Sequence, residues 1–199
     1  MNVYELFKEC LSIKYVAAGC CANYATRKNG DTLYIFFEKS VGKNDWKNNF
    51  SFSAKRYEGL FVHSGFLSVW EKILPQIEEN VFDKSVKKII VTGYSHGAAI
   101  ALLCHLFLQK HRPNIQSEVQ SYGFGCPRVL FGPNRKKAKQ YFKNFTVVRN
   151  IDDIVTHLPP AIFGFFHVGN MLKIGKKGTY SKVDAHREAN ILKELQKIN

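Results

Sequence analysis

Two kinds of apolar pattern alternate along this chain. Short continuous runs of apolar residues are typical of strands buried on both faces, and apolar residues recurring every three or four positions are typical of amphipathic helices. The continuous runs predict strands at residues 32–37, 89–91, 119–124 and 145–148. The three- and four-residue spacing predicts helices at residues 2–18, 66–79, 98–111 and 133–142, with a last helix opening at 184–186.

Strands that alternate with helices predict an α/β fold, in which a mostly parallel central sheet is flanked by helices on both faces. Near the end of the chain, residues 165–174 and 179–183 flank Gly175-Lys176-Lys177-Gly178, which predicts a β-hairpin. The sequence has neither internal repeats nor linker-like segments. We therefore expect residues 1–199 to form one domain.

The junction between the strand at 89–91 and the next helix carries the clearest chemical signal. It reads Gly93-Tyr94-Ser95-His96-Gly97, followed by Ala98 and Ala99. A strand that turns abruptly into a helix holds its turn residue above the sheet edge, and glycine avoids the Cβ collisions on either side. The bare Gly-x-Ser-x-Gly pattern also occurs by chance, but this strand and this helix favour a nucleophile elbow with Ser95 at its tip.

Acidic and imidazole side chains follow the elbow in the order that a serine hydrolase needs. The Asp152-Asp153 pair comes directly after the strand at 145–148, and His186 precedes the last helix. Functional groups in an open parallel sheet gather at the carboxyl ends of the strands. The order Ser, Asp, His is that of an α/β-hydrolase triad.

Composition limits the class of protein. The 199 residues are 45% hydrophobic and 14% aromatic, which excludes a disordered chain, and no apolar run is long enough to cross a bilayer. The first residues lack the layout of a signal peptide. The five cysteines are scattered and odd in number, so they predict no disulfide framework: they are Cys10, Cys20, Cys21, Cys104 and Cys126. We therefore expect an intracellular protein, cytoplasmic or peripheral to a membrane.

The chain is strongly basic. It has 29 Lys and Arg against 16 Asp and Glu, a net charge of +13. Such a balance favours contact with an anionic membrane surface, an acidic substrate or nucleic acid, although a solvated lysine-rich surface would look the same. Nucleic acid is the least favoured partner, because the sequence has no nucleic-acid-binding module and its basic residues do not alternate with stacking aromatics.

Several stretches together resemble the class 3 lipase family, the fungal-type triacylglycerol lipases and their relatives. The resemblance spans roughly residues 33–190. It is carried in order by Val62-His63-Ser64-Gly65-Phe66, Thr92-Gly93-Tyr94-Ser95-His96-Gly97-Ala98-Ala99, Tyr122-Gly123-Phe124-Gly125-Cys126-Pro127-Arg128-Val129, Asn150-Ile151-Asp152-Asp153-Ile154-Val155-Thr156-His157-Leu158-Pro159-Pro160, Phe166-His167-Val168-Gly169 and Asp184-Ala185-His186.

The resemblance implies a lipid ester hydrolase that works through an acyl-enzyme and needs neither cofactor nor metal. Ser95 is the implied nucleophile, Asp153 the acid and His186 the base. The backbone N–H groups of Ser40 and His96 are the implied oxyanion donors.

Three residues compete for these roles. Asp152 is the rival to Asp153, and His167 is the chief rival to His186, although packing or support of the site suits His167 better. His157 is expected to be structural. We expect the His96 side chain to point away from the reaction, since only its backbone is used.

The chain departs from the family pattern after the strand at 32–37. The usual Phe-Arg-Gly-Thr/Ser appears as Phe37-Glu38-Lys39-Ser40, and we expect the lid between Val41 and Tyr57 to be small or flexible. Aromatic residues could line an acyl pocket, touch a membrane or simply belong to the core: Trp46, Phe50, Phe52, Phe163, Phe165 and Phe166.

Two alternative functions remain open at this stage. One is phospholipase A-type cleavage of phospholipid acyl esters by the same chemistry. The other is a catalytically degenerate hydrolase fold that binds anionic membrane, which the Glu38-Lys39 departure allows.

Overall fold

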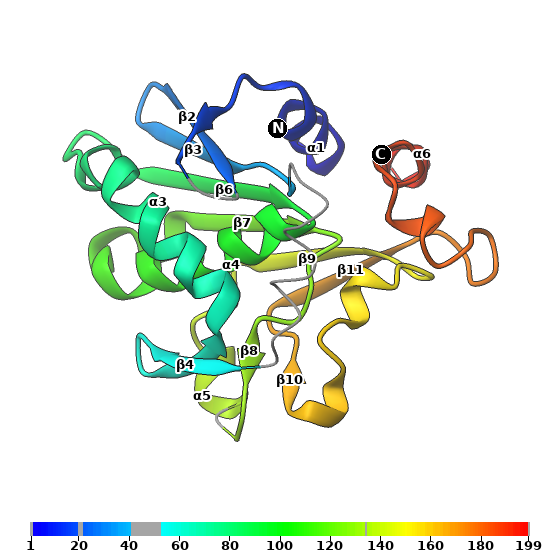
Figure 1. Ribbon diagram of the computed structural model, residues 1–199. Helices are drawn as coiled ribbons and strands as arrows, with labels where there is room; N and C mark the ends of the chain where they lie inside the picture. The colour runs from blue at the N-terminus through cyan, green and yellow to red at the C-terminus, as the bar shows by residue number, and fades with distance from the viewer. Residues whose placement is uncertain (1, 20–21, 41–52, 134, 199) are drawn as a thin grey trace.

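A seven-stranded sheet forms the centre of the molecule (Figure 1). The computed structural model describes residues 2–19, 22–40, 53–133 and 135–198. From one edge of the sheet to the other, the strands are β1 (Val16–Ala17), β2 (Asn23–Asn29), β3 (Thr32–Phe37), β6 (Lys88–Tyr94), β7 (Val119–Phe124), β9 (Phe145–Asn150) and β11 (Asn170–Ile174). The five strands from β3 to β11 are parallel, whereas β1 and β2 are antiparallel to their neighbours.

Helices cover both faces of this sheet, which confirms the predicted α/β fold. The helices α3 (Ser64–Phe82) and α4 (His96–His111) lie on one face, and α1 (Val3–Ser12) and α6 (Glu188–Gln196) lie on the other (Figure 1). Each face has its own apolar core. None of the helices among the described residues combines the length and apolar character that a membrane span requires.

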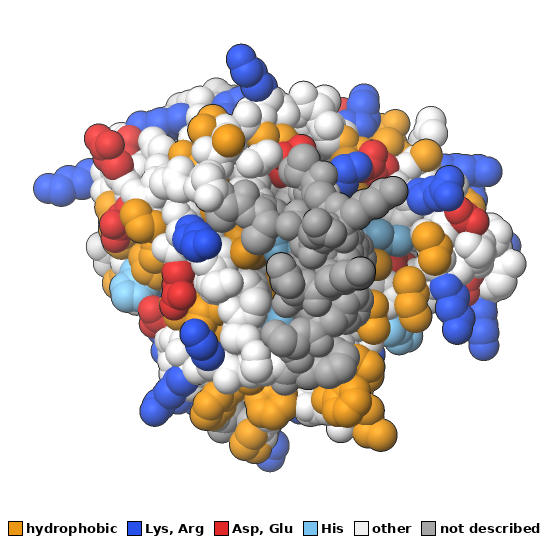
Figure 2. Space-filling model, viewed as in Figure 1, with side chains coloured by type: hydrophobic (Ala, Val, Ile, Leu, Met, Phe, Trp, Pro, Cys, Tyr) orange, Lys and Arg blue, Asp and Glu red, His pale blue; other side chains and the backbone are white. Residues whose placement is uncertain are grey.

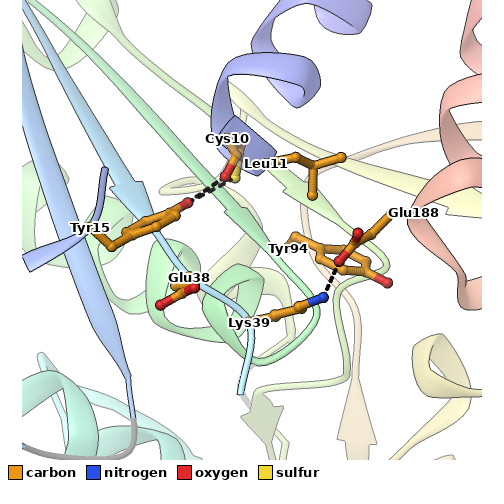
Figure 3. A pocket seen from close by; sticks show the side chains of 7 residues that line it. All are labelled: Cys10, Leu11, Tyr15, Glu38, Lys39, Tyr94 and Glu188. Carbon is orange, nitrogen blue, oxygen red and sulfur yellow. Dashed lines mark hydrogen bonds and ion pairs between the residues drawn. The ribbon is translucent and has the colours of Figure 1, made fainter. Parts of the chain in front are cut away.

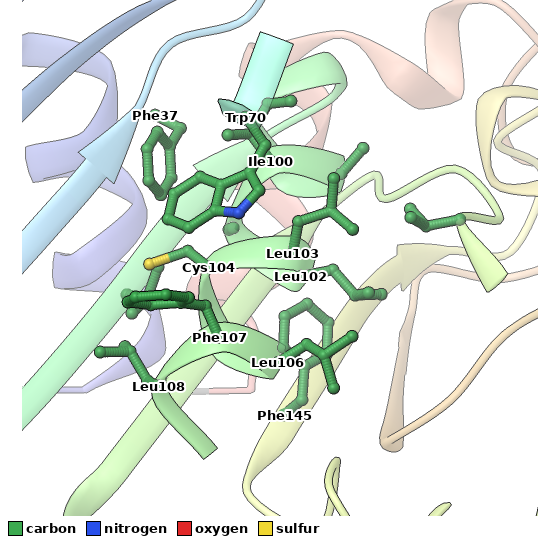
Figure 4. Close-up of a cluster of buried hydrophobic side chains, with 14 of the residues drawn as sticks. Phe37, Trp70, Ile100, Leu102, Leu103, Cys104, Leu106, Phe107, Leu108 and Phe145 are labelled. Atoms are coloured by element: carbon green, nitrogen blue, oxygen red, sulfur yellow. The ribbon is translucent and has the colours of Figure 1, made fainter. Parts of the chain in front are cut away.

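The helix α4 is the centre of the larger core. All residues from His96 to Leu108 are buried, so this helix is buried on every side and packs between the sheet and α3. Figure 4 shows Leu102, Leu103 and Leu106 among the ring side chains of Trp70 and Phe145. Dense packing on all sides fixes the start of α4, where Ser95 lies.

A second, smaller sheet lies beyond α3 and α4, and the sequence did not predict it. Its strands in order are β10 (Phe165–Phe166), β8 (Leu130–Phe131), β5 (Leu60–His63) and β4 (Ala54–Tyr57). Strands of two to four residues are too short to show a periodic pattern. The short basic helix α5 (Arg135–Lys139) lies beside this sheet (Figure 1). The 3₁₀ helices η1 (Pro113–Glu118), η2 (Val155–His157), η3 (Ala161–Phe163) and η4 (Asp184–His186) complete the described elements.

The predicted C-terminal hairpin is wrong. β11 ends at Ile174 and pairs in parallel with β9, while residues 179–183 form no strand and lead into η4. Gly175 follows with φ +75°, packed against the Asn150 side chain, so the chain turns away from the sheet edge instead of folding back along it. The glycines at 175 and 178 therefore serve a loop beside the site.

Two predicted helices are shorter than expected. The helix predicted at residues 2–18 ends at Ser12, where Ile13 is extended and the Tyr15 hydroxyl donates to the Cys10 carbonyl at 2.6 Å. The helix predicted at 133–142 is limited to α5. In both cases local hydrogen bonds after the helix replace further helical turns: after α5, the Phe142 N–H donates to the Lys139 carbonyl at 3.3 Å.

Candidate active site

Ser95 lies at the abrupt turn between β6 and α4 in a strained backbone conformation, with φ 56° and ψ −119°. A Cβ on Gly93 would lie 2.2 Å from the Gly97 carbonyl oxygen, and a Cβ on Gly97 would lie 2.2 Å from the Phe37 carbonyl oxygen. Only glycine fits at either position. The Ser95 N–H donates to the Phe124 carbonyl at 2.8 Å, which ties the turn to β7. The sequence Gly93-x-Ser95-x-Gly97 thus forms the strand–turn–helix geometry of a nucleophile elbow.

The structure brings Ser95, His186 and Asp153 into one chain of hydrogen bonds. The distance from Ser95 Oγ to His186 Nε2 is 2.8 Å, and that from His186 Nδ1 to Asp153 Oδ2 is also 2.8 Å. The Asp153 side chain is fully buried, whereas 14% of the His186 side chain is exposed. With Nδ1–H donating to the carboxylate, Nε2 carries the lone pair that accepts the serine proton.

The two neighbouring aspartates have separate partners. Asp153 Oδ1 accepts the Val155 N–H at 2.8 Å while Oδ2 binds His186. Asp152 Oδ2 accepts the Gly178 N–H at 2.8 Å and so holds the loop after β11. The acid beside the imidazole is therefore Asp153.

The rival histidines lie outside the hydrogen-bond chain. His167 Nε2 donates to the Thr156 carbonyl at 2.7 Å, and Thr156 Oγ1 donates to the Asp153 carbonyl at 2.8 Å. Burial lowers the pKa of His167 to about 4, so the ring is neutral and supports the loop that carries the acid. His157 is exposed at the end of η2 and contacts the Arg149 guanidinium.

Two further residues position His186, and sequence reasoning missed both. The Tyr94 hydroxyl donates to the His186 carbonyl, and the two rings stack with their centroids 5.1 Å apart. Gly125 has φ +57°, and a Cβ there would lie 2.7 Å from His186 Cε1 and 3.1 Å from Asp153 Oδ2. The signals in the sequence were the tyrosine inside the elbow and the repeated glycine of Gly123-Phe124-Gly125.

Of the two predicted oxyanion residues, His96 belongs to the elbow and Ser40 follows β3. His96 is the first residue of α4, so its N–H belongs to the positive end of the helix dipole, and its ring packs 5.5 Å from the Phe66 ring. Ser40 lies three residues beyond β3 and is partly exposed. The segment before it packs on the elbow helix, because the Phe37 and Glu38 carbonyl oxygens lie 2.2 and 2.5 Å from where a Gly97 Cβ would be.

The aromatic residues predicted for an acyl pocket differ in their exposure. Phe165 and Phe166 are buried at the second sheet, whereas 51% of Phe163 is exposed. Trp46, Phe50 and Phe52, with most of the predicted lid, lie outside the described residues. Within the described ranges, no group of three or more His, Cys, Asp or Glu side chains is arranged to hold a metal ion.

The chain is similar to known lipases. The sequence model of the family "Lipase (class 3)" matches residues 34–163. A lipase from Rhizomucor miehei is 34% identical over 154 residues, covering 69% of this chain and 40% of the relative. A secreted mono- and diacylglycerol lipase from Fusarium solani is 29% identical over 171 residues, covering 78% of this chain and 48% of the relative. The chain thus spans less than half the length of these two relatives.

A solved structure gives the same result. The structure of the Rhizomucor miehei triacylglyceride lipase superimposes with a TM-score of 0.67 at 30% identity, covering 82% of this chain and 66% of the other. His186 lies outside the span of the family match, so its place beside Ser95 rests on the geometry alone.

The expected intracellular location is wrong, because the Fusarium solani relative is a secreted lipase. The inference from the cysteines to a reducing compartment fails for a physical reason. Cys10, Cys104 and Cys126 are each buried in the apolar core, and burial raises the pKa of the Cys10 thiol to about 12. A buried, protonated thiol is inert in either redox environment, so it carries no information about the compartment.

The family match covers more than half of the chain and includes the elbow, and the R. miehei structure has the same fold. The protein belongs to the class 3 lipase family.

Proposed function

We propose that this protein hydrolyses carboxylic esters of lipids, with Ser95 as nucleophile, His186 as base and Asp153 as the acid that orients His186. The observation that carries the proposal is the pair of 2.8 Å contacts joining the three side chains. Because this chain of contacts is complete, it favours an active enzyme and not a catalytically degenerate fold. The activity would reside in a single α/β-hydrolase domain, residues 1–199.

The chemistry follows from this arrangement. His186 Nε2 takes the Ser95 hydroxyl proton as the serine oxygen bonds to the ester carbonyl carbon and the carbonyl electron pair moves onto oxygen. When the intermediate collapses, the bond to the alcohol oxygen breaks and His186 returns the proton to the departing alcohol. Water then repeats the sequence on the acyl-enzyme, which releases the carboxylic acid and restores Ser95.

The negative charge that develops on the carbonyl oxygen needs donors that are already in place. We assign this role to the backbone N–H groups of His96 and Ser40. Support comes from the position of His96 at the start of α4 and from the packing of residues 37 and 38 against Gly97. Losing one such donor typically costs about 10²- to 10³-fold in rate.

The substrate class that we favour is the acylglycerols, since the relatives include a mono- and diacylglycerol lipase and a triacylglyceride lipase. Phospholipid acyl esters are the alternative within the same chemistry. Rates on a diacylglycerol and on phosphatidylglycerol with identical acyl chains, in matched mixed micelles, would separate the two. Faster release of fatty acid from phosphatidylglycerol would reverse the assignment.

We also propose peripheral contact with anionic membrane through the second sheet. Phe61, Ile162 and Phe163 are 40%, 88% and 51% exposed. Phe61 lies on β5, which pairs with β8, and β8 pairs with β10, the strand that follows η3. Beside this sheet, α5 carries four exposed basic side chains. Figure 2 shows apolar side chains gathered at the lower edge of the molecule, where this sheet lies.

Apolar residues bordered by lysine and arginine suit a surface of anionic lipid. Sedimentation with phosphatidylglycerol vesicles should show binding that weakens with added salt and that is lost in Ile162→Ser/Phe163→Ser. Equal binding to phosphatidylcholine vesicles, or to an oligonucleotide, would contradict this contact.

Ser95→Ala tests the proposed reaction. The variant should lose ester hydrolysis while keeping the thermal unfolding midpoint of the wild type, because the exchange removes one oxygen atom. Hydrolysis that persists in the purified variant would end the assignment of Ser95 as the nucleophile.

A further inference from the structure

The segment that replaces the family's Arg-Gly, Glu38-Lys39, is tied to the rest of the fold at two points. The Glu38 N–H donates to the Asn23 carbonyl at 3.0 Å, and Asn23 Nδ2 donates to Glu38 Oε2 at 2.7 Å, which fastens the segment to β2. Lys39 Nζ forms an ion pair with Glu188 Oε1 across 149 positions of the chain.

Glu188 connects this segment to the base. It is the first residue of α6 and comes two residues after His186. The Lys39–Glu188 pair therefore joins the segment leading to Ser40, which we assign to the oxyanion, with the segment that carries the imidazole. Figure 3 shows the ammonium and the carboxylate meeting beside the Tyr94 ring, whose hydroxyl binds the His186 carbonyl.

The Lys39–Glu188 ion pair borders a cavity. The cavity has a volume of about 270 Å³, and Lys39, Tyr94 and Glu188 line it together with Cys10 and Tyr15. The side chains of Lys39 and Glu188 are 50% and 35% exposed. Where packed atoms are few, the relative position of two segments depends on the polar links between them.

We propose that the Lys39–Glu188 ion pair sets the position of the Ser40 segment relative to His186, which makes Lys39 and Glu188 positioning residues for ester hydrolysis. The inference rests on the proposed function. The pair acts on rate and not on stability, because an exposed ion pair contributes little to folding. Breaking it displaces an oxyanion donor without removing it, so the loss in kcat stays below the loss for a missing donor.

Neutral and swapped variants test this role. Lys39→Met and Glu188→Gln should each lower kcat on a short soluble ester about fivefold with KM unchanged, and the double variant should be no worse than either. The swapped variant Lys39→Glu/Glu188→Lys should regain kcat to within about twofold of the wild type. At about 1 M NaCl, where the Debye length is ~3 Å, wild-type kcat should fall toward that of the single variants.

A second ion pair provides the matched control. Lys28 and Asp83 are 41% and 38% exposed and also join remote segments. Lys28 pairs with Leu33, which pairs with Ile89 near the start of β6, whereas Ser95 follows the carboxyl end of β6. Lys28→Met should leave kcat unchanged. The positioning role is refuted if Lys39→Met behaves like Lys28→Met, or if the swapped variant is no more active than the single variants.

Hydrogen–deuterium exchange distinguishes this inference from the proposed function. In Lys39→Met, amides of residues 186–190 should exchange faster than in the wild type and in Lys28→Met. If the wild type hydrolyses no ester, the proposed function fails and exchange alone decides whether the link exists. Unchanged exchange at residues 186–190 would refute the link.

Discussion

Gly125→Ala is the substitution whose effect on the site can be worked out most fully. The added Cβ would lie 2.7 Å from His186 Cε1 and 2.8 Å from Nδ1. Ordinary contact begins at 3.4 Å, so the imidazole must move by about 0.7 Å, the difference between 3.4 and 2.7 Å. Moving it stretches both the Ser95 and the Asp153 hydrogen bonds, which are 2.8 Å long.

The substitution also adds backbone strain, which needs a separate control. Gly125 has φ +57°, where an alanine costs about 1–2 kcal/mol. Gly30 has φ +59° in the turn between β2 and β3, with nothing within 4 Å of an added Cβ. Gly30→Ala therefore carries the same backbone strain without the collision.

Gly30→Ala should lose about 1–2 kcal/mol of unfolding free energy by urea denaturation, and Gly125→Ala should lose at least as much. Only Gly125→Ala should lose activity, by about 10- to 100-fold in kcat on a soluble ester, since a misplacement near 1 Å can cost about 10²-fold. If kcat of Gly125→Ala stays within about twofold of Gly30→Ala, the steric account of this glycine is refuted.

Three further predictions concern two residues of the site and one buried histidine of the core. Asp153→Asn should lower kcat by about 10⁴-fold because it favours the wrong tautomer of the His186 imidazole, whereas Asp152→Asn should keep kcat within about threefold. Similar losses in the two variants would contradict Asp153 as the acid. Tyr94→Phe removes the hydroxyl bound to the His186 carbonyl and should lower kcat about threefold to tenfold with KM unchanged, so unaltered kcat would remove Tyr94 from the site. Burial lowers the pKa of His105 to about 4 from an ordinary 6.5, so between these values the unfolded chain binds a proton that the folded chain does not. The free energy of unfolding should therefore fall by about 3 kcal/mol between pH 6.5 and 4. In urea titrations His105→Gln should reduce this dependence on pH, and an unchanged dependence would contradict the prediction.

The elbow was predictable from the sequence because most of its signals are local. Gly93 is required by the nearby Gly97 carbonyl, and the apolar run before the elbow and the alanines after it mark the strand and the helix. Gly97 is required instead by the remote Phe37 and Glu38 carbonyls, so only the motif itself indicates it. The class of fold followed from the alternation of strands and helices. The family followed from short motifs whose order the chain preserves.

The remaining features depend on partners far apart in the sequence. Tyr94 meets His186 from 92 positions away, and Lys39 meets Glu188 from 149 positions away, so no local pattern indicates either contact. The sequence of residues 165–174 predicts half of a hairpin, because only the pairing of β11 with its remote partner β9 shows that the strand is parallel. Cys10 shows the same limit, because the reactivity of its thiol depends on its burial and not on the number of cysteines in the chain.

The central claim is that Ser95 is an activated nucleophile within an assembled triad. The most direct test is to react the purified protein with a fluorophosphonate probe and to locate the adduct by mass spectrometry of its peptides. We expect a single adduct on Ser95 that disappears in His186→Ala, because the imidazole must take the serine proton. A folded protein that stays unlabelled, or an adduct on another residue, would contradict the claim.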